Sequence, residues 1–342
     1  WVIRKIRYLG IEFGRNGYRP HKATETFKAL YGDCKDTATL ITALLQAAGI
    51  DSKLVLIRTV DAGAVPPDSL PMPNLFNHCI AYVPALEGHD YWIDCTTDFH
   101  RLGEVPHSDE TAQVLVVDSA GGSFVKIPGS TSQNNSIEQK FNAKVEKSGA
   151  AVLELYDIRC GQFAPAYREL AETPGQYERY IKDYAAKRFN GAEVESLELA
   201  KGDEQGPMWM KVKLKSSALA TQSGERKSLP VALDPMFLSA RYAGDTKRKH
   251  DLELFFPWSR KCEIIYQLDK SLSVASLPEE VSLKESFGTY TRTLVRNGET
   301  LTIKEALELT RSRIAVAEYE AFKQFCNRVD SLLEQKVLLE TK

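Results

Sequence analysis

The sequence predicts an α+β protein of two domains, on three observations. The chain has 342 residues, enough for two domains that each bury a core. Its first part mixes helical and strand-like segments, whereas strand-like runs dominate the remainder. A polar, turn-rich segment separates the two parts. We therefore expect a mixed domain over residues 1–128, a linker over 129–136 and a β-rich domain over 137–342.

Two helices are predicted near the start of the first domain. Residues 23–32 form a short helical pattern that ends at a glycine. Residues 34–48 form a longer one, followed by Gly49, a typical helix stop. Apolar residues recur in this second segment at helical spacing, at Ala38, Ile41, Leu44, Leu45 and Ala48.

Three strands are predicted after these helices. The composition of residues 52–60 is typical of a strand, and a proline-rich loop follows over 61–74. Residues 78–85 and 90–97 are two further β-like runs, separated by the turn-forming residues LEGH. We expect these two runs to form an antiparallel pair.

The second domain is predicted to be mainly β, with two helical regions. Residues 165–189 are helical with an interruption near Pro174, and a closing helix over 315–334 precedes a short strand at 337–340. The predicted strands cover residues 140–145, 150–160, 208–216, 251–256, 260–268 and 289–295.

The bulk composition excludes several classes of protein. A formal net charge of −2 gives no field that would attract nucleic acid or an anionic membrane. No run of about 18 apolar residues predicts a membrane-spanning helix. The six cysteines are too sparse for a disulfide scaffold, and the lack of a CxxC pair argues against a structural zinc ribbon. Because the chain opens with Trp1 inside an amphipathic pattern, we expect it to be a fragment of a longer protein.

The most informative residue is Cys34, in the stretch YGDCKDTATLITALLQAAG. A thiol at a helix N-terminus meets the positive end of the helix dipole, which favours the nucleophilic thiolate. The free N–H groups there could also stabilise an oxyanion. Asp33 is expected to cap the helix, and Asp36 to complement its dipole.

A base and an orienting acid are available on the two predicted strands. His78 opens the run HCIAYV, and Asp94 lies in YWIDC. If the two strands pair, the imidazole and the carboxylate can share a face and lie over the start of the Cys34 helix. A thiol, a base and an acid in this relation are the components of a nucleophilic triad.

Together, the segments GDCKDTATLITALLQAAGI, VLIRT, FNHCIAYV and YWIDCTT resemble the transglutaminase-like superfamily of papain-like cysteine enzymes. The resemblance implies a helix bearing the nucleophile Cys34, packed on an antiparallel sheet, with His78 as base and Asp94 as orienting acid. It implies acyl transfer through a thioester on a polypeptide or peptide-like substrate, and no cofactor.

The whole chain is similar to bacterial proteins that place a β-sandwich of unknown function before such a core and a β-rich domain after it. The resemblance therefore implies that an N-terminal sandwich of the same protein packs nearby. It also implies a location in the cell envelope or periplasm.

Several alternatives stay open. Water as acyl acceptor would make the protein a peptidase or amidase, and an amine would make it a transglutaminase. A different class of function is a non-catalytic binding or assembly module of the cell envelope that retains the fold. Cys34 could also be a buried structural thiol. A calcium-regulated transglutaminase has little support, because no dense acidic loop is present.

Other cysteines and histidines suggest weaker sites. Cys79 and Cys95 could form a metal site with Cys34 and His78, but strand alternation places them on the face opposite to His78 and Asp94, so we expect no metal. A disulfide between Cys79 and Cys95 is possible but weakly supported, because the two residues are only diagonal neighbours if His78 lies opposite Asp94. The remaining candidates lie in polar loops and could line a cleft: His21, His100 and His107.

Overall fold

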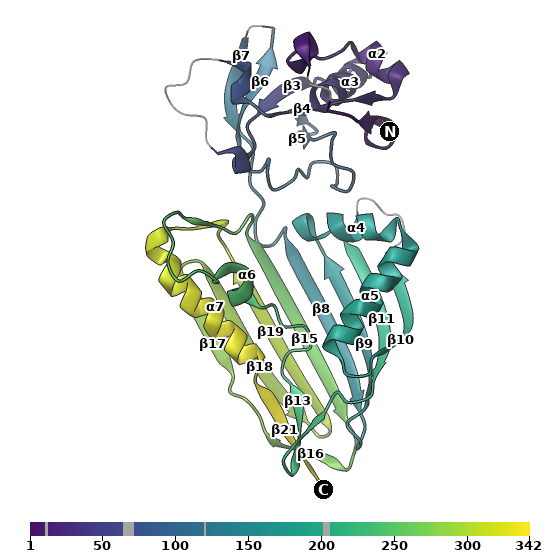
Figure 1. The fold of residues 1–342 in the computed structure, drawn as a ribbon, viewed down its shortest axis with the longest axis vertical. Helices are drawn as coiled ribbons and strands as arrows, with labels where there is room; N and C mark the ends of the chain where they lie inside the picture. The colour runs from purple at the N-terminus through teal and green to yellow at the C-terminus, as the bar shows by residue number, and fades with distance from the viewer. Residues whose placement is uncertain (11–12, 64–71, 120, 201–205) are drawn as a thin grey trace. The chain divides into compact units, whose positions relative to one another are not determined.

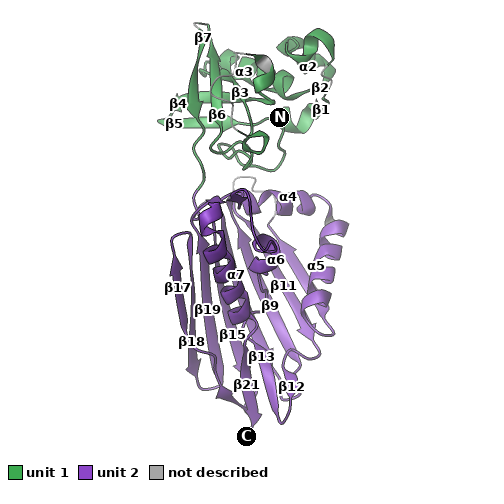
Figure 2. Cartoon of the chain, turned by 60° about the vertical axis from the view of Figure 1, so that its left-hand side comes forward, with its two compact units in different colours: residues 1–130 green, residues 131–342 purple. Residues whose placement is uncertain are grey.

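The computed structural model describes residues 1–10, 13–63, 72–119, 121–200 and 206–342. The chain divides into two compact units, Trp1–Ser130 and Thr131–Lys342, shown in different colours in Figure 2. Residues 64–71 of the predicted proline-rich loop lie outside the described residues. No helix in the described ranges is long and apolar enough to cross a membrane.

Unit 1 is built on a five-stranded sheet in which all neighbouring strands are antiparallel. The order across the sheet is β5-β4-β3-β6-β7. The strands are β3 (Lys53–Ile57), β4 (His78–Leu86), β5 (His89–Ile93), β6 (Gln113–Asp118) and β7 (Gly121–Lys126). The predicted antiparallel pair is therefore present as β4 and β5 (Figure 1).

Helix α3 (Cys34–Ala47) packs on one face of this sheet. Its Ala38 is fully buried and clusters with Cys79 of β4, next to Leu54 and Leu56 of β3. The other face buries a separate apolar cluster that contains Val55, Ile80 and Trp92. The remaining elements of the unit are α1 (Val2–Lys5), α2 (Ala23–Ala29) and the parallel pair β1 (Arg7–Tyr8) and β2 (Tyr31–Gly32).

Unit 2 is built on an eight-stranded sheet in the order β10-β11-β9-β8-β15-β19-β18-β17. The central pair β8–β15 is parallel, and every other neighbouring pair is antiparallel. The strands are β8 (Ser136–Val145), β9 (Ala151–Arg159), β10 (Glu193–Leu199), β11 (Met208–Ser216), β15 (Trp258–Leu268), β17 (Val281–Glu285), β18 (Gly288–Asn297) and β19 (Thr300–Leu309).

One face of the large sheet carries the helices and a smaller sheet of order β12-β13-β21-β16 (Figure 1). The smaller sheet consists of β12 (Thr221–Ser223), β13 (Arg226–Pro230), β16 (Leu272–Ser276) and β21 (Lys336–Thr341). The helices are α4 (Pro165–Ala171), α5 (Pro174–Arg188), α6 (Leu238–Tyr242) and α7 (Tyr319–Leu333). A short pair, β14 (Leu252–Glu253) and β20 (Arg313–Ile314), completes the unit.

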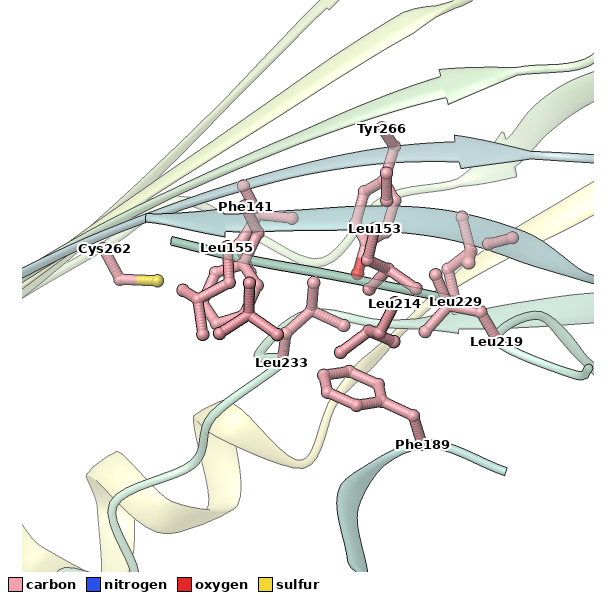
Figure 3. Close-up of a cluster of buried hydrophobic side chains, with 14 of the residues drawn as sticks. Phe141, Leu153, Leu155, Phe189, Leu214, Leu219, Leu229, Leu233, Cys262 and Tyr266 are labelled. Atoms are coloured by element: carbon pink, nitrogen blue, oxygen red, sulfur yellow. The ribbon is translucent and has the colours of Figure 1, made fainter. Parts of the chain in front are cut away.

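Strand alternation explains the core between these layers. In β8, Phe141, Ala143 and Val145 are buried, whereas the residues between them are exposed. Figure 3 shows the side chain of Leu153 near Leu214 of β11 and Leu229 of the smaller sheet, with Phe189 at the end of α5 below them, and Phe141 beside Leu155 and Leu233. The inward face of the large sheet is thus covered by apolar side chains from both the smaller sheet and α5.

The predicted α+β class is confirmed, with a cysteine-bearing helix on an antiparallel sheet followed by a β-rich part with a closing helix. The prediction for residues 251–256 was wrong in extent, because only Leu252–Glu253 pair as a strand. The sequence patterns also missed several strands, among them β6, β10 and β19.

Candidate active site

Cys34 is the first residue of α3, and two acids fix the helix start around it. Asp33 is the N-cap, and its Oδ1 accepts a hydrogen bond from the backbone N–H of Asp36 at 3.2 Å. Asp36 Oδ2 in turn accepts from the backbone N–H of Asp33 at 3.3 Å. This reciprocal capping box accounts for the acids on both sides of the thiol. Lys35 forms an ion pair with Asp33.

His21 contributes to the same helix start. Its backbone N–H donates to Asp36 Oδ1 at 2.8 Å, and its Nδ1 lies 3.0 Å from Asp36 Oδ2. The side chain of His21 is 42% exposed. The structure thus assigns His21 a contact that ties its loop to α3.

His78 and Asp94 are brought together by the pairing of β4 with β5. Ala81 pairs with Ile93, so Asp94 lies just beyond the end of β5 and diagonal to His78 on the same face. His78 Nε2 is 3.1 Å from Asp94 Oδ2. Both side chains are largely buried, 14% and 3% exposed.

The carboxylate of Asp94 is held in place by its own turn. Its Oδ1 accepts hydrogen bonds from the backbone N–H of Thr96 at 2.8 Å and from the Thr96 hydroxyl at 2.7 Å. Burial alone would raise the pKa of Asp94, but hydrogen bonding and attraction to His78, with the Thr96 bonds, lower it. Asp94 is therefore ionised at neutral pH.

The imidazole of His78 links Asp94 to Cys34. Burial acts to lower the pKa of His78, but hydrogen bonds to Asp94 and Cys34, with the negative charges of Asp94 and Asp109, raise it to about 10. His78 therefore keeps its proton at neutral pH. The structure brings Cys34, His78 and Asp94 into one connected group, and their catalytic role stays a prediction.

Cys79 of β4 and Cys95, just after β5, point toward α3, on the face of the sheet opposite to His78 and Asp94. Cys79 packs with Cys34 and Ala38, and Cys95 packs with Leu40. Both are free thiols. Burial raises the pKa of Cys79 well above its usual value and that of Cys95 to about 12. The two side chains are thus packed as small apolar groups.

Asp109 is a site residue that sequence reasoning missed. It lies in the loop between β5 and β6 and is 1% exposed. Ligand-type atoms of His78, Asp94 and Asp109 all lie within 4.8 Å of one another, a spacing that a metal ion could bridge. Two of the three groups already pair with each other, since His78 Nε2 contacts Asp94 Oδ2. The irregular loop around Asp109 gave no sequence signal.

Two known families match separate parts of the chain, one within each compact unit. Residues 1–96, which contain Cys34, His78 and Asp94, match the transglutaminase-like superfamily. Residues 228–339 match a family described as a domain of unknown function with solved structure (DUF3858). Among curated proteins, none matches the chain.

A solved structure shares the fold. The chain is similar to the crystal structure of a "putative protease" from Parabacteroides distasonis, with a TM-score of 0.55 and 13% sequence identity. The similarity covers 99% of this chain and 50% of that one, so the chain spans about half the length of that protein. At this level of identity, the comparison concerns the fold.

Proposed function

We propose that this chain, whose N-terminal unit is a transglutaminase-like core, performs thiol-dependent acyl transfer at an amide or ester carbonyl. The observation that carries the proposal is the grouping of the three side chains: His78 Nε2 lies 3.1 Å from Asp94 Oδ2, and Cys34 lies close enough to His78 to raise its pKa. Cys34 acts as nucleophile, His78 carries the proton and Asp94 orients the imidazole.

The reaction follows from the positions of these groups. Cys34 Sγ attacks the carbonyl carbon, and we expect the backbone N–H of Cys34, at the start of α3, to donate to the resulting oxyanion. His78 gives its proton to the leaving amine or alcohol, and a thioester remains on Cys34. His78 then accepts a proton from the incoming water or amine, which releases the acyl group and restores the thiolate.

The proposed substrate is a polypeptide or peptide-like molecule. The match to the transglutaminase-like superfamily and the name of the Parabacteroides protein, a "putative protease", support this proposal. We favour hydrolysis over transamidation, since water needs no second substrate pocket. Incorporation of a primary amine, supplied in excess, into the product would instead identify a transglutaminase. The cell-envelope location and the N-terminal sandwich stay predictions.

The first test is the alkylation of Cys34 by iodoacetamide as a function of pH, followed for each cysteine by mass spectrometry. Because a protonated His78 stabilises the thiolate, Cys34 is expected to react fast well below the free-thiol pKa of about 8.5. His78→Ala is expected to remove this reactivity. The buried thiols whose pKa is raised serve as internal controls: Cys79, Cys95, Cys262 and Cys326.

Two outcomes would contradict the proposal. One is a Cys34 that reacts no faster than a free thiol at every pH. The other is a fast reaction that persists unchanged in His78→Ala, because the imidazole would then play no part in activating the sulfur.

A further inference from the structure

Asp109 has a buried oxygen that lacks a hydrogen-bond donor. Its Oδ1 accepts from the hydroxyl of Ser108 at 3.1 Å. Its Oδ2 is buried, and no N–H or O–H group of the described residues donates to it. A buried carboxylate oxygen without a donor is costly if the group is ionised. Asp109 Oδ2 therefore needs a partner, and no N–H or O–H donor of the described residues provides one.

The nearest polar groups are those of the Cys34–His78–Asp94 site. Oxygens of Asp94 and Asp109 and a ring nitrogen of His78 lie within 4.8 Å of one another. Asp94 accepts from Thr96 at one oxygen and faces His78 with the other. A carboxylate accepts about four hydrogen bonds, so these three contacts leave Asp94 room for one further donor.

The proton of this pair is best placed on Asp109. Two carboxylates this close in a buried site cannot both be ionised without a large repulsion. Thr96 and His78 stabilise the ionised form of Asp94, whereas Ser108 is the one donor found for Asp109 among the described residues. A protonated Asp109 Oδ2 would be the missing donor for Asp94, and both carboxyl groups would then be satisfied.

We propose that Asp109 is a positioning residue of the Cys34–His78–Asp94 site, where its protonated Oδ2 donates a hydrogen bond to Asp94 and fixes that carboxylate against His78. The effect of Asp109 on the reactivity of Cys34 rests on the proposed function. The proton on Asp109 depends on the burial and contacts of Asp94, Asp109 and His78, and not on catalysis by Cys34.

A proton on Asp109 makes the contact between Asp94 and His78 sensitive to pH near neutrality. Burial and the charge of Asp94 raise the pKa of Asp109 to about 7, against the opposing effects of His78 and Ser108. As the pH rises through this value, Asp109 loses its proton, Asp94 loses a donor and a second negative charge faces His78. Cys34 faces His78 from α3, and the titratable residues within two positions of Asp109 in the sequence are His107 and Glu110. Glu110 accepts hydrogen bonds from Ser130.

The test is an NMR titration of ¹⁵N-histidine-labelled protein, with the His78 ring signals assigned by comparison with His78→Gln. In the wild type, these signals are expected to show a step near pH 7, although His78 itself stays protonated. Asp109→Asn keeps a donor for Asp94 but cannot ionise, so the step should disappear. His107→Gln and Glu110→Gln are matched controls that should leave it in place.

Reactivity provides the second readout. Asp109→Asn should keep the alkylation rate of Cys34 within a few-fold at pH 6, because the amide N–H replaces the acid proton. Asp109→Leu removes the donor and should lower this rate by about 10- to 100-fold, the usual effect of losing a group that orients a site residue. Thermal melts of both variants separate this loss from unfolding.

A step that persists in Asp109→Asn would overturn the proposal, and so would a step that vanishes when the wild type is treated with EDTA, which would indicate a bound cation. Equal Cys34 reactivity in the asparagine and leucine variants would also overturn it. The step can be read in Cys34→Ala as well, so it stays measurable even if Cys34 proves unreactive and the proposed function fails.

Discussion

Replacement of Cys34 by alanine is expected to abolish acyl transfer, lowering the rate roughly 10⁴-fold or more, because no other group can carry the acyl intermediate. An activated ester such as p-nitrophenyl acetate provides the measurement, since attack by Cys34 Sγ transfers the acetyl group and releases coloured p-nitrophenolate. The wild type should give a burst that is stoichiometric with the protein. Cys34→Ala should give none.

The matched control is Cys160→Ala. Cys160 is partly exposed and lies in unit 2, so it is the cysteine most open to non-specific acylation. Its removal should leave the burst unchanged. A burst that survives in Cys34→Ala, or that disappears in Cys160→Ala, would show that the acetyl group is carried elsewhere and would contradict the assignment of the nucleophile.

Replacement of Arg292 by methionine is expected to destabilise unit 2 by about 3 kcal/mol or more. Arg292 of β18 is fully buried. Its Nη1 donates to the backbone oxygen of Leu332 at 2.7 Å, and its Nη2 donates to Gln335 Oε1 at 2.5 Å and to the Glu279 oxygen at 3.1 Å. Methionine would fill much of the space but would remove the donor to Gln335 Oε1 and to the backbone oxygen of Glu279, and would leave the Leu332 oxygen with the backbone N–H of Gln335.

Urea denaturation followed by far-UV circular dichroism measures this loss. Arg296→Met is the control, because Arg296 is exposed on the same strand and makes longer hydrogen bonds, at 3.3 and 3.4 Å. Its substitution should change the unfolding free energy by less than about 0.5 kcal/mol. Similar losses in the two variants would mean that the buried hydrogen bonds of Arg292 contribute little.

Local patterns were sufficient to predict the elements that hold the candidate site. The helix that begins at Cys34 has both a cap and a periodic apolar pattern, and β4 and β5 are short apolar runs joined by a turn. His78 and Asp94 each lie within about one residue of a strand end, so predicting the strands also placed these side chains.

Asp109 could not be predicted in the same way. It stands in the polar run HSDE, which reads as solvated loop, yet it is buried. Its position depends on how the irregular segment after Asp94 folds back beside His78. No period of 2 or 3.6 residues describes such a segment, so a candidate residue of the site stayed hidden until the tertiary structure was known.

Tertiary contacts also overrode local preference elsewhere. The segment KEALEL contains good helix formers, but it lies in β19, between β15 and β18. In α3 the predicted apolar stripe is only partly correct, since Leu44 is 42% exposed while Leu40 and Thr42 are buried. The sequence thus predicted that a helix forms but not fully which face it buries.

We expect the parallel pair at the centre of the large sheet, β8 and β15, to limit the rate of folding. Strands β8 to β11 build one half of the sheet, and strands β15, β17, β18 and β19 build the other. The halves meet along the β8–β15 pair, which begins where Ser136 pairs with Ser259. Pairing β8 with β15 closes the long loop of chain that lies between them. This closure costs chain entropy before the contacts between the two strands can form. Pulse-labelling hydrogen exchange should therefore protect the β18–β19 hairpin before the amides between β8 and β15.

Simultaneous protection of both sets would instead indicate that the whole sheet forms in one concerted step. With the expected order, two local half-sheets form first in unit 2, and the pairing of β8 with β15 follows as the slow step. Its rate of folding then depends on that single seam, and substitutions along β8 and β15 should act on it more strongly than equally buried substitutions at the edges of the sheet.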